Sequence, residues 1–411
     1  MNRETVRHDL FAQRLYACDS TSPIAGLELL DQYIAERAFG DATRVVDVLI
    51  AAHPNDVDVL RSALQVSIAN HDAVRARLFS CRLVEAAPDR LDVRAERVLV
   101  LGRLGLRAEA EVELEQLLQS IASARDAGGQ LPQDAIVHEA RFLTRGLSFV
   151  GADIPDDAPE PEDAQKDTEP GCLFVSGLPR SGTTALGNLL NLSPQIQLFN
   201  ELYPPFHVYE PADFTPSALR KMLGFQSNSK EDKQLRTDLS GARWIGDKRP
   251  QFHFAAGASL LRLANHKVTV VHIVRDLSSI ARSYDERALD ATDPAWGATR
   301  NGWEALFEGK AVAEFLGQLV RKRLRAHHRL MFVQYEEIFS RQDVAISMFE
   351  NLGVDITDAL RAEVTEFQAS STSILDRANP QAERYRELFE AWHGLESVNR
   401  FKSVTGFSYL S

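Results

Sequence analysis

Residues 173–184, LFVSGLPRSGTT, decide the fold. The apolar run that ends at Gly177 predicts a buried strand, and the loop after it leads into the helical pattern TALGNLLNL at 184–192. A strand, a glycine-bounded loop and a helix make a phosphate-binding loop. The glycines let successive backbone N–H groups point at one anion, and the helix adds the positive end of its dipole. The stretch therefore predicts an anion-binding site at the start of a helix.

This loop lacks the lysine of a Walker A loop. Position 183 is threonine, and Arg180 stands three residues earlier. A Walker A lysine contacts the β- and γ-phosphates, and the hydroxyl beside it binds Mg²⁺. Arg180 can instead hold a single phosphate through two donors. A P-loop kinase or nucleotide triphosphatase is an alternative, with Asp276 as its one obvious metal ligand, but Thr183 counts against it.

The surrounding pattern predicts an α/β fold. Short apolar runs alternate with helical ones: strands are expected at 172–177, 243–246, 267–275 and 329–336, and helices at 184–192, 254–264, 276–289, about 303–326 and 343–353. Such alternation is typical of a parallel sheet flanked by helices. Ligands of such sheets bind at the carboxyl ends of the strands.

The first third of the chain repeats itself. Ala42, Ala76 and Ala110 lie 34 residues apart, and Pro54 and Pro88 share that spacing. A 34-residue period with a small residue where helices cross resembles the tetratricopeptide repeat. An irregular helical bundle with coincidental spacing is the alternative, and both are all-helical. We expect a domain of this repeat type over residues 1–150.

A change in composition marks the domain boundary. Residues 151–170 contain four prolines and eight acidic residues against one lysine. Such a segment buries no core and indicates an exposed linker. We therefore predict a second domain over residues 171–411, which contains the phosphate loop.

The whole-chain composition excludes several classes of protein. The 411 residues carry a formal net charge of −12, which disfavours a nucleic-acid or anionic-membrane surface. The 3 cysteines show no C-x-x-C spacing, as expected in a reducing compartment. The charged N-terminus does not look like a signal peptide, and no run suits a membrane span. These features predict a cytoplasmic protein.

A second motif lies downstream of the loop. In VVHIVRDLSSIARSY, Arg275 ends a predicted strand and Ser283 follows eight residues later in a predicted helix. Taken alone, Arg275 beside Asp276 would be a surface ion pair worth little. However, a strand end in the same sheet brings Arg275 to the edge where Arg180 lies. Two basic sites at one edge suit a ligand with two anionic ends.

Together these motifs resemble the sulfotransferase family, whose sulfuryl donor is 3′-phosphoadenosine-5′-phosphosulfate. The resemblance covers about residues 171–353. It includes FVQYEEIFSRQDVAISMFENLGV at 332–354, which looks like the Y-E-D-L element of that family. It implies that the phosphate loop holds the 5′-phosphosulfate and that Arg275 and Ser283 hold the 3′-phosphate. The loop residues concerned are Pro179, Arg180, Ser181, Gly182, Thr183 and Thr184.

The resemblance also implies catalytic residues. Glu201, in LFNELYPPF at 198–206, occupies the position of the catalytic glutamate of the tyrosylprotein and heparan branches. Lys248, in IGDKRPQF at 245–252, matches their K-x-P element as a cation near the sulfuryl group. Arg180 would offset charge on the departing phosphate, so no metal is required. The basic element that closes over the 3′-phosphate is not evident, and Arg400 and Lys402 are weak substitutes.

The leading hypothesis is therefore a sulfotransferase that transfers a sulfuryl group from the nucleotide donor to a hydroxyl group by in-line displacement. The acceptor class stays open among protein tyrosine, carbohydrate and small molecule. The helical repeats suggest a peptide or protein partner. A non-catalytic repeat scaffold with a degenerate nucleotide-binding domain is a third hypothesis. The presence of Arg180, Glu201, Lys248, Arg275 and Ser283 argues against it.

Overall fold

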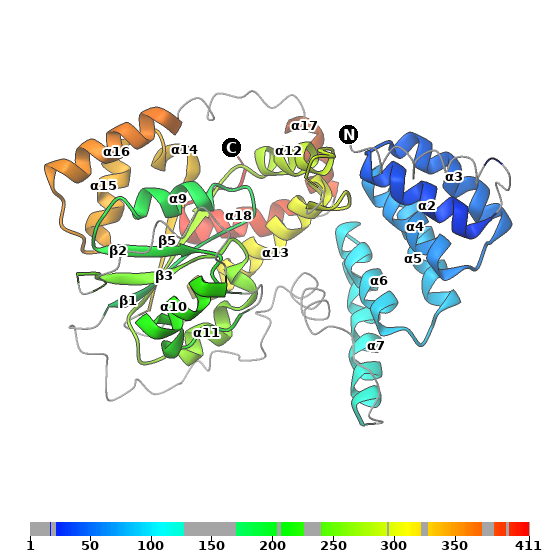
Figure 1. Ribbon diagram of the computed structural model, residues 1–411, viewed down its shortest axis with the longest axis horizontal. Coiled ribbons are helices and arrows are strands. Elements are labelled where there is room, and N and C mark those ends of the chain that lie inside the picture. The colour runs from blue at the N-terminus through cyan, green and yellow to red at the C-terminus, as the bar shows by residue number, and fades with distance from the viewer. Residues whose placement is uncertain are drawn as a thin grey trace. The chain divides into compact units, whose positions relative to one another are not determined.

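The computed structural model divides the chain into two compact units. The first comprises Met1–Arg145, Ala281–Phe307 and Tyr385–His393, and the second comprises Gly146–Ile280, Glu308–Arg384 and Gly394–Ser411. The described residues are 17, 22–126, 170–203, 207–225, 239, 241–293, 296–321, 328–371, 382–391 and 394–410. Of the expected linker at 151–170, all but Pro170 lies outside them. Figure 1 shows the helices and strands of both units.

The N-terminal part of the first unit is a helical repeat. Its helices are α2 (Pro23–Ala35), α3 (Phe39–Ala52), α4 (Val57–Ala69), α5 (Ala73–Ala86), α6 (Leu91–Arg103) and α7 (Arg107–Asp126). Helices α2, α4 and α6 begin 34 residues apart, and so do α3, α5 and α7. The predicted 34-residue helical period is therefore present in the structure, while its assignment to the tetratricopeptide type stays a resemblance.

The repeat extends to the turns and the packing. The turn between the two helices of each pair contains one residue in the left-handed region, at φ 60, 57 and 73 for Arg37, His71 and Gly105. These three positions are again 34 residues apart. Ala42, Ala76 and Ala110 are all 0% exposed, because a neighbouring helix lies against each. The same local structure thus recurs in each pair.

Segments from later in the chain also belong to the first unit. Asn301 Nδ2 donates to the carbonyl of Ile68 at 2.8 Å, and Arg103 Nη2 pairs with Glu304 Oε2 at 2.8 Å. The aromatic side chains Trp296, Trp303 and Phe307 are buried there, at 7%, 4% and 7% exposed. The sequence did not indicate that residues 281–307 and 385–393 join the repeats. The boundaries 1–150, 151–170 and 171–411 stay a prediction.

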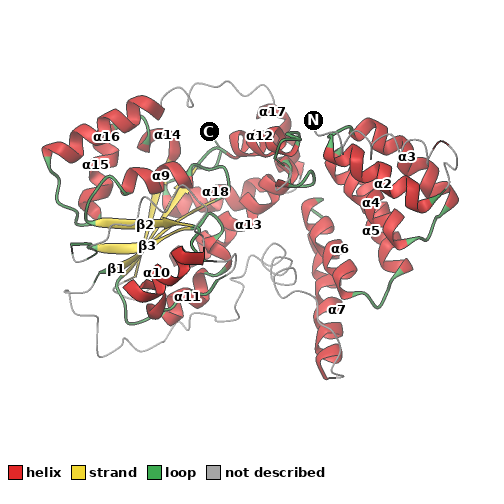
Figure 2. Ribbon diagram, viewed as in Figure 1, coloured by secondary structure: helices red, strands yellow, loops and turns green. Residues whose placement is uncertain are grey.

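The second unit is built on a parallel sheet. Its strands are β1 (Gly171–Gly177), β2 (Ile196–Asn200), β3 (Trp244–Lys248), β4 (Val268–Val274) and β5 (His328–Gln334), in the order β2-β3-β1-β4-β5. All four pairings are parallel, so all five carboxyl ends lie at one edge (Figure 2). The predicted α/β class and its central strands are confirmed. Strand β2 was not predicted.

The other helices of the described residues follow β1 in the chain. They are α9 (Thr183–Leu190), α10 (Pro216–Phe225), α11 (Ala256–Arg262), α12 (Leu277–Ala288), α13 (Gly302–Arg321), α14 (Tyr335–Ile338), α15 (Gln342–Asn351), α16 (Asp358–Ser371), α17 (Ala382–Ala391) and α18 (Gly394–Thr405), with short 3₁₀ turns at Pro211–Phe214 and Phe252–Phe254. Helices α12, α13 and α17 each extend across a border between the two units. No helix in the described part of the chain has the length and apolar character needed to cross a membrane.

The two faces of the sheet have separate cores. On β1, Leu173 and Val175 belong to a buried cluster that includes side chains of α9, α14, α15 and α16. Phe174 points to the other face, since side chains alternate along a strand. It stacks on Phe252 at 4.4 Å and contacts Tyr209 at 4.8 Å. Strand β1 is therefore buried on both sides, and its loop is held at the edge.

Candidate active site

The phosphate loop follows β1 and ends where α9 begins at Thr183. Arg180 and Gly182 both take left-handed backbone, at φ 65 and φ 98. A Cβ on Gly182 would lie 2.4 Å from the ring of Tyr335, so only glycine fits there. Tyr335 is 7% exposed and packs on the loop as a core residue. The loop conformation is thus fixed by its own backbone and by α14.

One hydroxyl in the loop has no partner within the described structure. Ser181 is 0% exposed, and its Oγ makes no hydrogen bond to any described group. Thr183 is 3% exposed and Thr184 is exposed. Buried polar atoms are nearly always hydrogen-bonded, and an orphan of this kind needs an explanation. A phosphate or sulfate oxygen held by the loop supplies one.

Arg275 lies beside this loop, at the end of β4. Its Nη1 donates to the carbonyl of Arg180 at 2.8 Å, and its guanidinium lies 4.2 Å from the centre of the Tyr335 ring. Its Nε is buried and makes no hydrogen bond to any described group. Ser283 lies on α12, in the first unit, so its pairing with Arg275 stays a prediction. Arg180 itself is exposed.

Glu201 and Lys248 form an ion pair at the same edge of the sheet. Glu201 directly follows β2, Lys248 ends β3, and Lys248 Nζ lies 2.6 Å from Glu201 Oε1. The Lys248 side chain is 4% exposed and the Glu201 side chain 49%. The Lys248 stem also passes α9, since a Cβ on Gly187 would lie 3.5 Å from it. The ammonium is thus buried, while the carboxylate is open to solvent.

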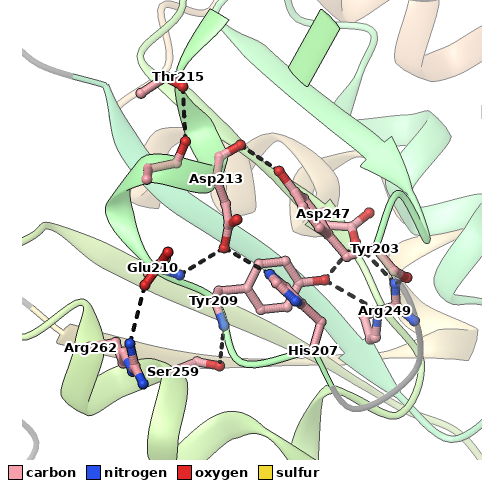
Figure 3. Close-up of polar contacts among 11 residues, drawn as sticks. Tyr203, His207, Tyr209, Glu210, Asp213, Thr215, Asp247, Arg249, Ser259 and Arg262 are labelled. Atoms are coloured by element: carbon pink, nitrogen blue, oxygen red, sulfur yellow. Dashed lines mark hydrogen bonds and ion pairs between the residues drawn. The ribbon is translucent and has the colours of Figure 1, made fainter. Parts of the chain in front are cut away.

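A buried polar cluster next to this pair was missed by the sequence reading. Asp247 and Arg249 flank Lys248, and both contact Tyr209 (Figure 3). Burial raises the pKa of the Asp247 carboxyl, and the charge of Arg249 opposes that rise. Burial also raises the pKa of the Tyr209 hydroxyl well above its ordinary value. The run of three charges at the end of a buried strand was the available signal.

Over the described residues, no group of three or more histidine, cysteine, aspartate or glutamate side chains could hold a metal ion. Arg400, the weak substitute for a 3′-phosphate ligand, pairs with Glu396 at 2.6 Å on α18, and Lys402 is exposed on the same helix. The role suggested for these two residues stays a prediction.

Comparison with known proteins gives a family match over part of the chain. Residues 170–358 match the model of the Sulfotransferase family. No curated protein matches the chain. The crystal structure of a sulfotransferase from Alicyclobacillus acidocaldarius is 17% identical, with 51% of this chain and 94% of that one covered and a TM-score of 0.30.

A second solved structure is similar over a longer range. It is a mutant of the O-GlcNAc transferase from Thermobaculum terrenum, at 9% identity and a TM-score of 0.29, with 93% of this chain and 95% of that one covered. The strand order and the parallel register carry the fold assignment. The segment that matches the Sulfotransferase family is the one that contains the phosphate loop, Glu201, Lys248 and Arg275.

Proposed function

We propose that this protein is a sulfotransferase that uses 3′-phosphoadenosine-5′-phosphosulfate and transfers its sulfuryl group to a hydroxyl group. The observation that carries the proposal is the ion pair between Glu201 and Lys248, 2.6 Å long, at the sheet edge that also bears the phosphate loop. A carboxylate and a buried cation beside an anion-binding loop are the groups that such a transfer needs.

The donor would bind by its two anionic ends. The loop residues Pro179, Arg180, Ser181, Gly182, Thr183 and Thr184 would hold the 5′-phosphosulfate, with backbone N–H groups and hydroxyls as donors. Two buried donors without a described partner support the two anion sites. They are Ser181 Oγ in the loop and Arg275 Nε beside it. Arg275 and Ser283 would hold the 3′-phosphate. Threonine at position 183 suits a donor that is not a triphosphate.

The transfer is an in-line displacement at sulfur. An oxygen–sulfur bond forms from the acceptor hydroxyl, and the bond between sulfur and the 5′-phosphate oxygen breaks. Glu201 takes the proton of the hydroxyl, and adenosine 3′,5′-bisphosphate leaves with the bonding electrons. Lys248 contacts Glu201 Oε1, which leaves Oε2 to accept the proton. The Lys248 ammonium and Arg180 offset the negative charge that develops on the sulfuryl and leaving groups.

The proposal also covers the acceptor, a partner for the helical repeat and the location of the protein. The acceptor is a hydroxyl of a protein tyrosine, a carbohydrate or a small molecule. The 34-residue helical repeat supports a peptide or protein partner, because stacked helix pairs form extended binding surfaces. We place the protein in the cytoplasm, without a nucleic-acid partner, a membrane span or a required metal.

Nucleotide binding tests the proposal. Calorimetry should show saturable binding of adenosine 3′,5′-bisphosphate, and at least about tenfold weaker binding of adenosine 5′-monophosphate, which lacks one anion. Transfer from ³⁵S-labelled donor is then measured with 4-nitrophenol, a tyrosine peptide, N-acetylglucosamine and water as acceptors. A protein that does not bind the bisphosphate, or that Mg²⁺-ATP stabilises instead, would contradict the proposal.

A further inference from the structure

The charged residues at the end of β3 form a buried cluster around the proposed reacting pair. We propose that Asp247, Arg249 and Tyr209 are positioning residues that hold the backbone directly after Glu201, at Leu202 and Tyr203, so that the Glu201 carboxylate stays aligned with Lys248. This inference rests on the proposed function, because it assigns a role around the base and the cation named there. The three residues come from the end of β3, the residue after it and the segment that follows Glu201 (Figure 3).

The chain that leaves β2 is tied to β3 immediately after the last strand residue. The backbone N–H of Glu201 donates to the carbonyl of Lys248 at 3.0 Å. The next N–H, that of Leu202, donates to Asp247 Oδ1 at 3.2 Å. The first bond continues the sheet ladder, whereas the second uses a side chain. The Asp247 carboxylate therefore takes the place of a backbone acceptor where the pairing of β2 with β3 ends.

Arg249 and Tyr209 complete the attachment. The guanidinium of Arg249 donates to the carbonyl of Tyr203, and its Nε donates to the Tyr209 hydroxyl at 3.2 Å. That hydroxyl donates to Asp247 Oδ2 at 2.6 Å. The backbone N–H of Tyr209 donates to Ser259 Oγ at 3.1 Å, which anchors it to α11. Strand, loop and helix are thus joined through one set of side chains.

Burial makes this set rigid. Asp247 and Tyr209 are 0% exposed and Arg249 is 6% exposed. Removing two charges from water offsets most of their attraction, so a buried pair adds little net stability. Once present, however, each charge requires its partner, and alternative arrangements of the loop are strongly disfavoured. A cluster of this kind fixes a conformation more than it stabilises the fold.

The backbone of Glu201 has an unfavourable conformation that needs to be held by its surroundings. Glu201 has φ 56, in the left-handed region that a residue with a side chain rarely adopts. Such a conformation persists only where the surroundings determine it. If the bonds to Asp247 and Arg249 were lost, the backbone could relax to extended φ. The carboxylate would then turn away from Lys248.

Two conservative variants test the inference. Tyr209→Phe removes the hydroxyl and keeps the ring that contacts Phe174 at 4.8 Å, and Asp247→Asn removes the buried charge. Arg262→Ala is the matched control, because Arg262 pairs with Glu210 at 3.2 Å in an exposed position of the same region. For each protein we would measure the transfer rate with the fastest model acceptor, the affinity for adenosine 3′,5′-bisphosphate, and amide hydrogen exchange over residues 199–203.

The expected result separates positioning from general loss of structure. Both variants should lower kcat by on the order of 10- to 100-fold, as small misplacements of a catalytic group do. Amide exchange over 199–203 should become faster, while the nucleotide affinity changes less than about twofold. The control should match the wild type in all three measurements. Should Asp247→Asn fail to fold, Tyr209→Phe alone decides.

Two outcomes would overturn the inference. One is a folded Tyr209→Phe protein with wild-type kcat and wild-type exchange over residues 199–203. The other is a loss of nucleotide affinity in proportion to kcat, which would indicate a general structural defect. A wild-type protein that neither binds the bisphosphate nor transfers sulfate contradicts the proposed function instead. The exchange measurement then still shows whether the cluster holds this segment.

Discussion

At the residue scale, Glu201 combines a strained backbone, a solvent-open carboxylate and a buried cationic partner. Glycine or asparagine would adopt this φ at lower cost. At Glu201 the strained backbone coincides with a carboxylate that pairs with a buried ammonium. This supports the view that the side chain is needed for chemistry.

We therefore expect Glu201→Gln to abolish most turnover while nucleotide binding persists. Removing a general base lowers kcat by about 10²- to 10⁴-fold. The glutamine keeps the shape of the side chain, so the affinity for adenosine 3′,5′-bisphosphate should stay within a few-fold. Initial rates with labelled donor and calorimetry measure the two effects. The exposed Glu336→Gln on α14 serves as control, and equal turnover by Glu201→Gln would remove Glu201 from the role of base.

Ser181 and Ser176 provide a matched pair of buried hydroxyls. Ser176 Oγ lies 3.2 Å from His272 Nδ1, whereas Ser181 Oγ has no described partner. Ser176→Ala should lower the free energy of unfolding by about 1–3 kcal/mol, because it leaves a buried imidazole atom unpaired. Ser181→Ala should leave stability unchanged or slightly higher and should weaken nucleotide binding. Thermal melts and calorimetry measure the two effects, and an unchanged nucleotide affinity of Ser181→Ala would contradict a ligand at this hydroxyl.

Substitution of Arg275 tests the second anion site. Arg275→Ala removes a charge that the loop carbonyl of Arg180 holds in place. We expect the affinity for adenosine 3′,5′-bisphosphate to fall at least about tenfold, since a charge-assisted bond to phosphate is lost. Binding of adenosine 5′-monophosphate should change little. Arg243→Ala, an exposed arginine just before β3, is the control, and unchanged bisphosphate affinity would reject the assignment.

At the element scale, the strands that surround the phosphate loop follow from the sequence. Strands β1 and β4 are seven residues long, mostly apolar and buried throughout, as expected of central parallel strands. Strand β2 could not be recognised, because its five residues, IQLFN, include two polar side chains and form no long apolar run. Its burial comes from pairing with β3, a contact between segments far apart in the sequence.

The difference between local patterns and long-range contacts also explains which site residues could be predicted from the sequence. Glycines, Arg180 and Arg275 stand next to strand ends and are visible in a local pattern. Asp247 and Arg249 look locally like solvated charges before a proline. In the fold they are buried and both bond Tyr209, about forty residues earlier in the chain. Such long-range burial leaves no periodic trace in the chain.

The pairing of β1 with β4 leads to a pH prediction. His272 lies between Ser176 and Tyr409, and burial lowers its pKa from 6.5 to about 3. The unfolded chain therefore binds a proton below about pH 6.5 that the folded protein does not accept. Stability should fall as the pH drops from 6.5 toward 3, by up to about 1.4 kcal/mol per pH unit.

His272→Gln tests this prediction, because glutamine bonds similar partners but does not titrate. Urea unfolding at pH 7.5 and 5.5 should show the wild type losing about 1 kcal/mol more than the variant between these two values. The carboxylates titrate in both proteins, so their contribution to the loss of stability cancels when the two are compared. Equal losses would mean that His272 is protonated in the folded protein, or neutral in both states.

At the scale of the whole molecule, the first compact unit is discontinuous in sequence. Residues 281–307 contribute to it Asp285, which accepts hydrogen bonds from the backbone N–H of Gly302 at 2.6 Å and from the Tyr385 hydroxyl at 2.5 Å. Burial alone would raise the pKa of Asp285, yet hydrogen bonds from His71 and Tyr385 lower it. The Asp285 carboxylate therefore links three stretches of the chain, through His71 in the repeats, Gly302 and Tyr385.

We therefore expect a protein cut at the predicted boundary, residues 171–411, to be less stable than the full chain. Without the repeats, Trp303 and Phe307, now 4% and 7% exposed, lose the helices that cover them, and Glu304 loses Arg103. Each large apolar side chain returned to water costs about 1.5–3 kcal/mol. Melting of the fragment should start at a lower temperature, and the fragment should bind a dye for exposed apolar surface. Residues 1–126 expressed separately and added back should restore part of the loss. A fragment as stable as the full chain would instead support an independent domain over 171–411.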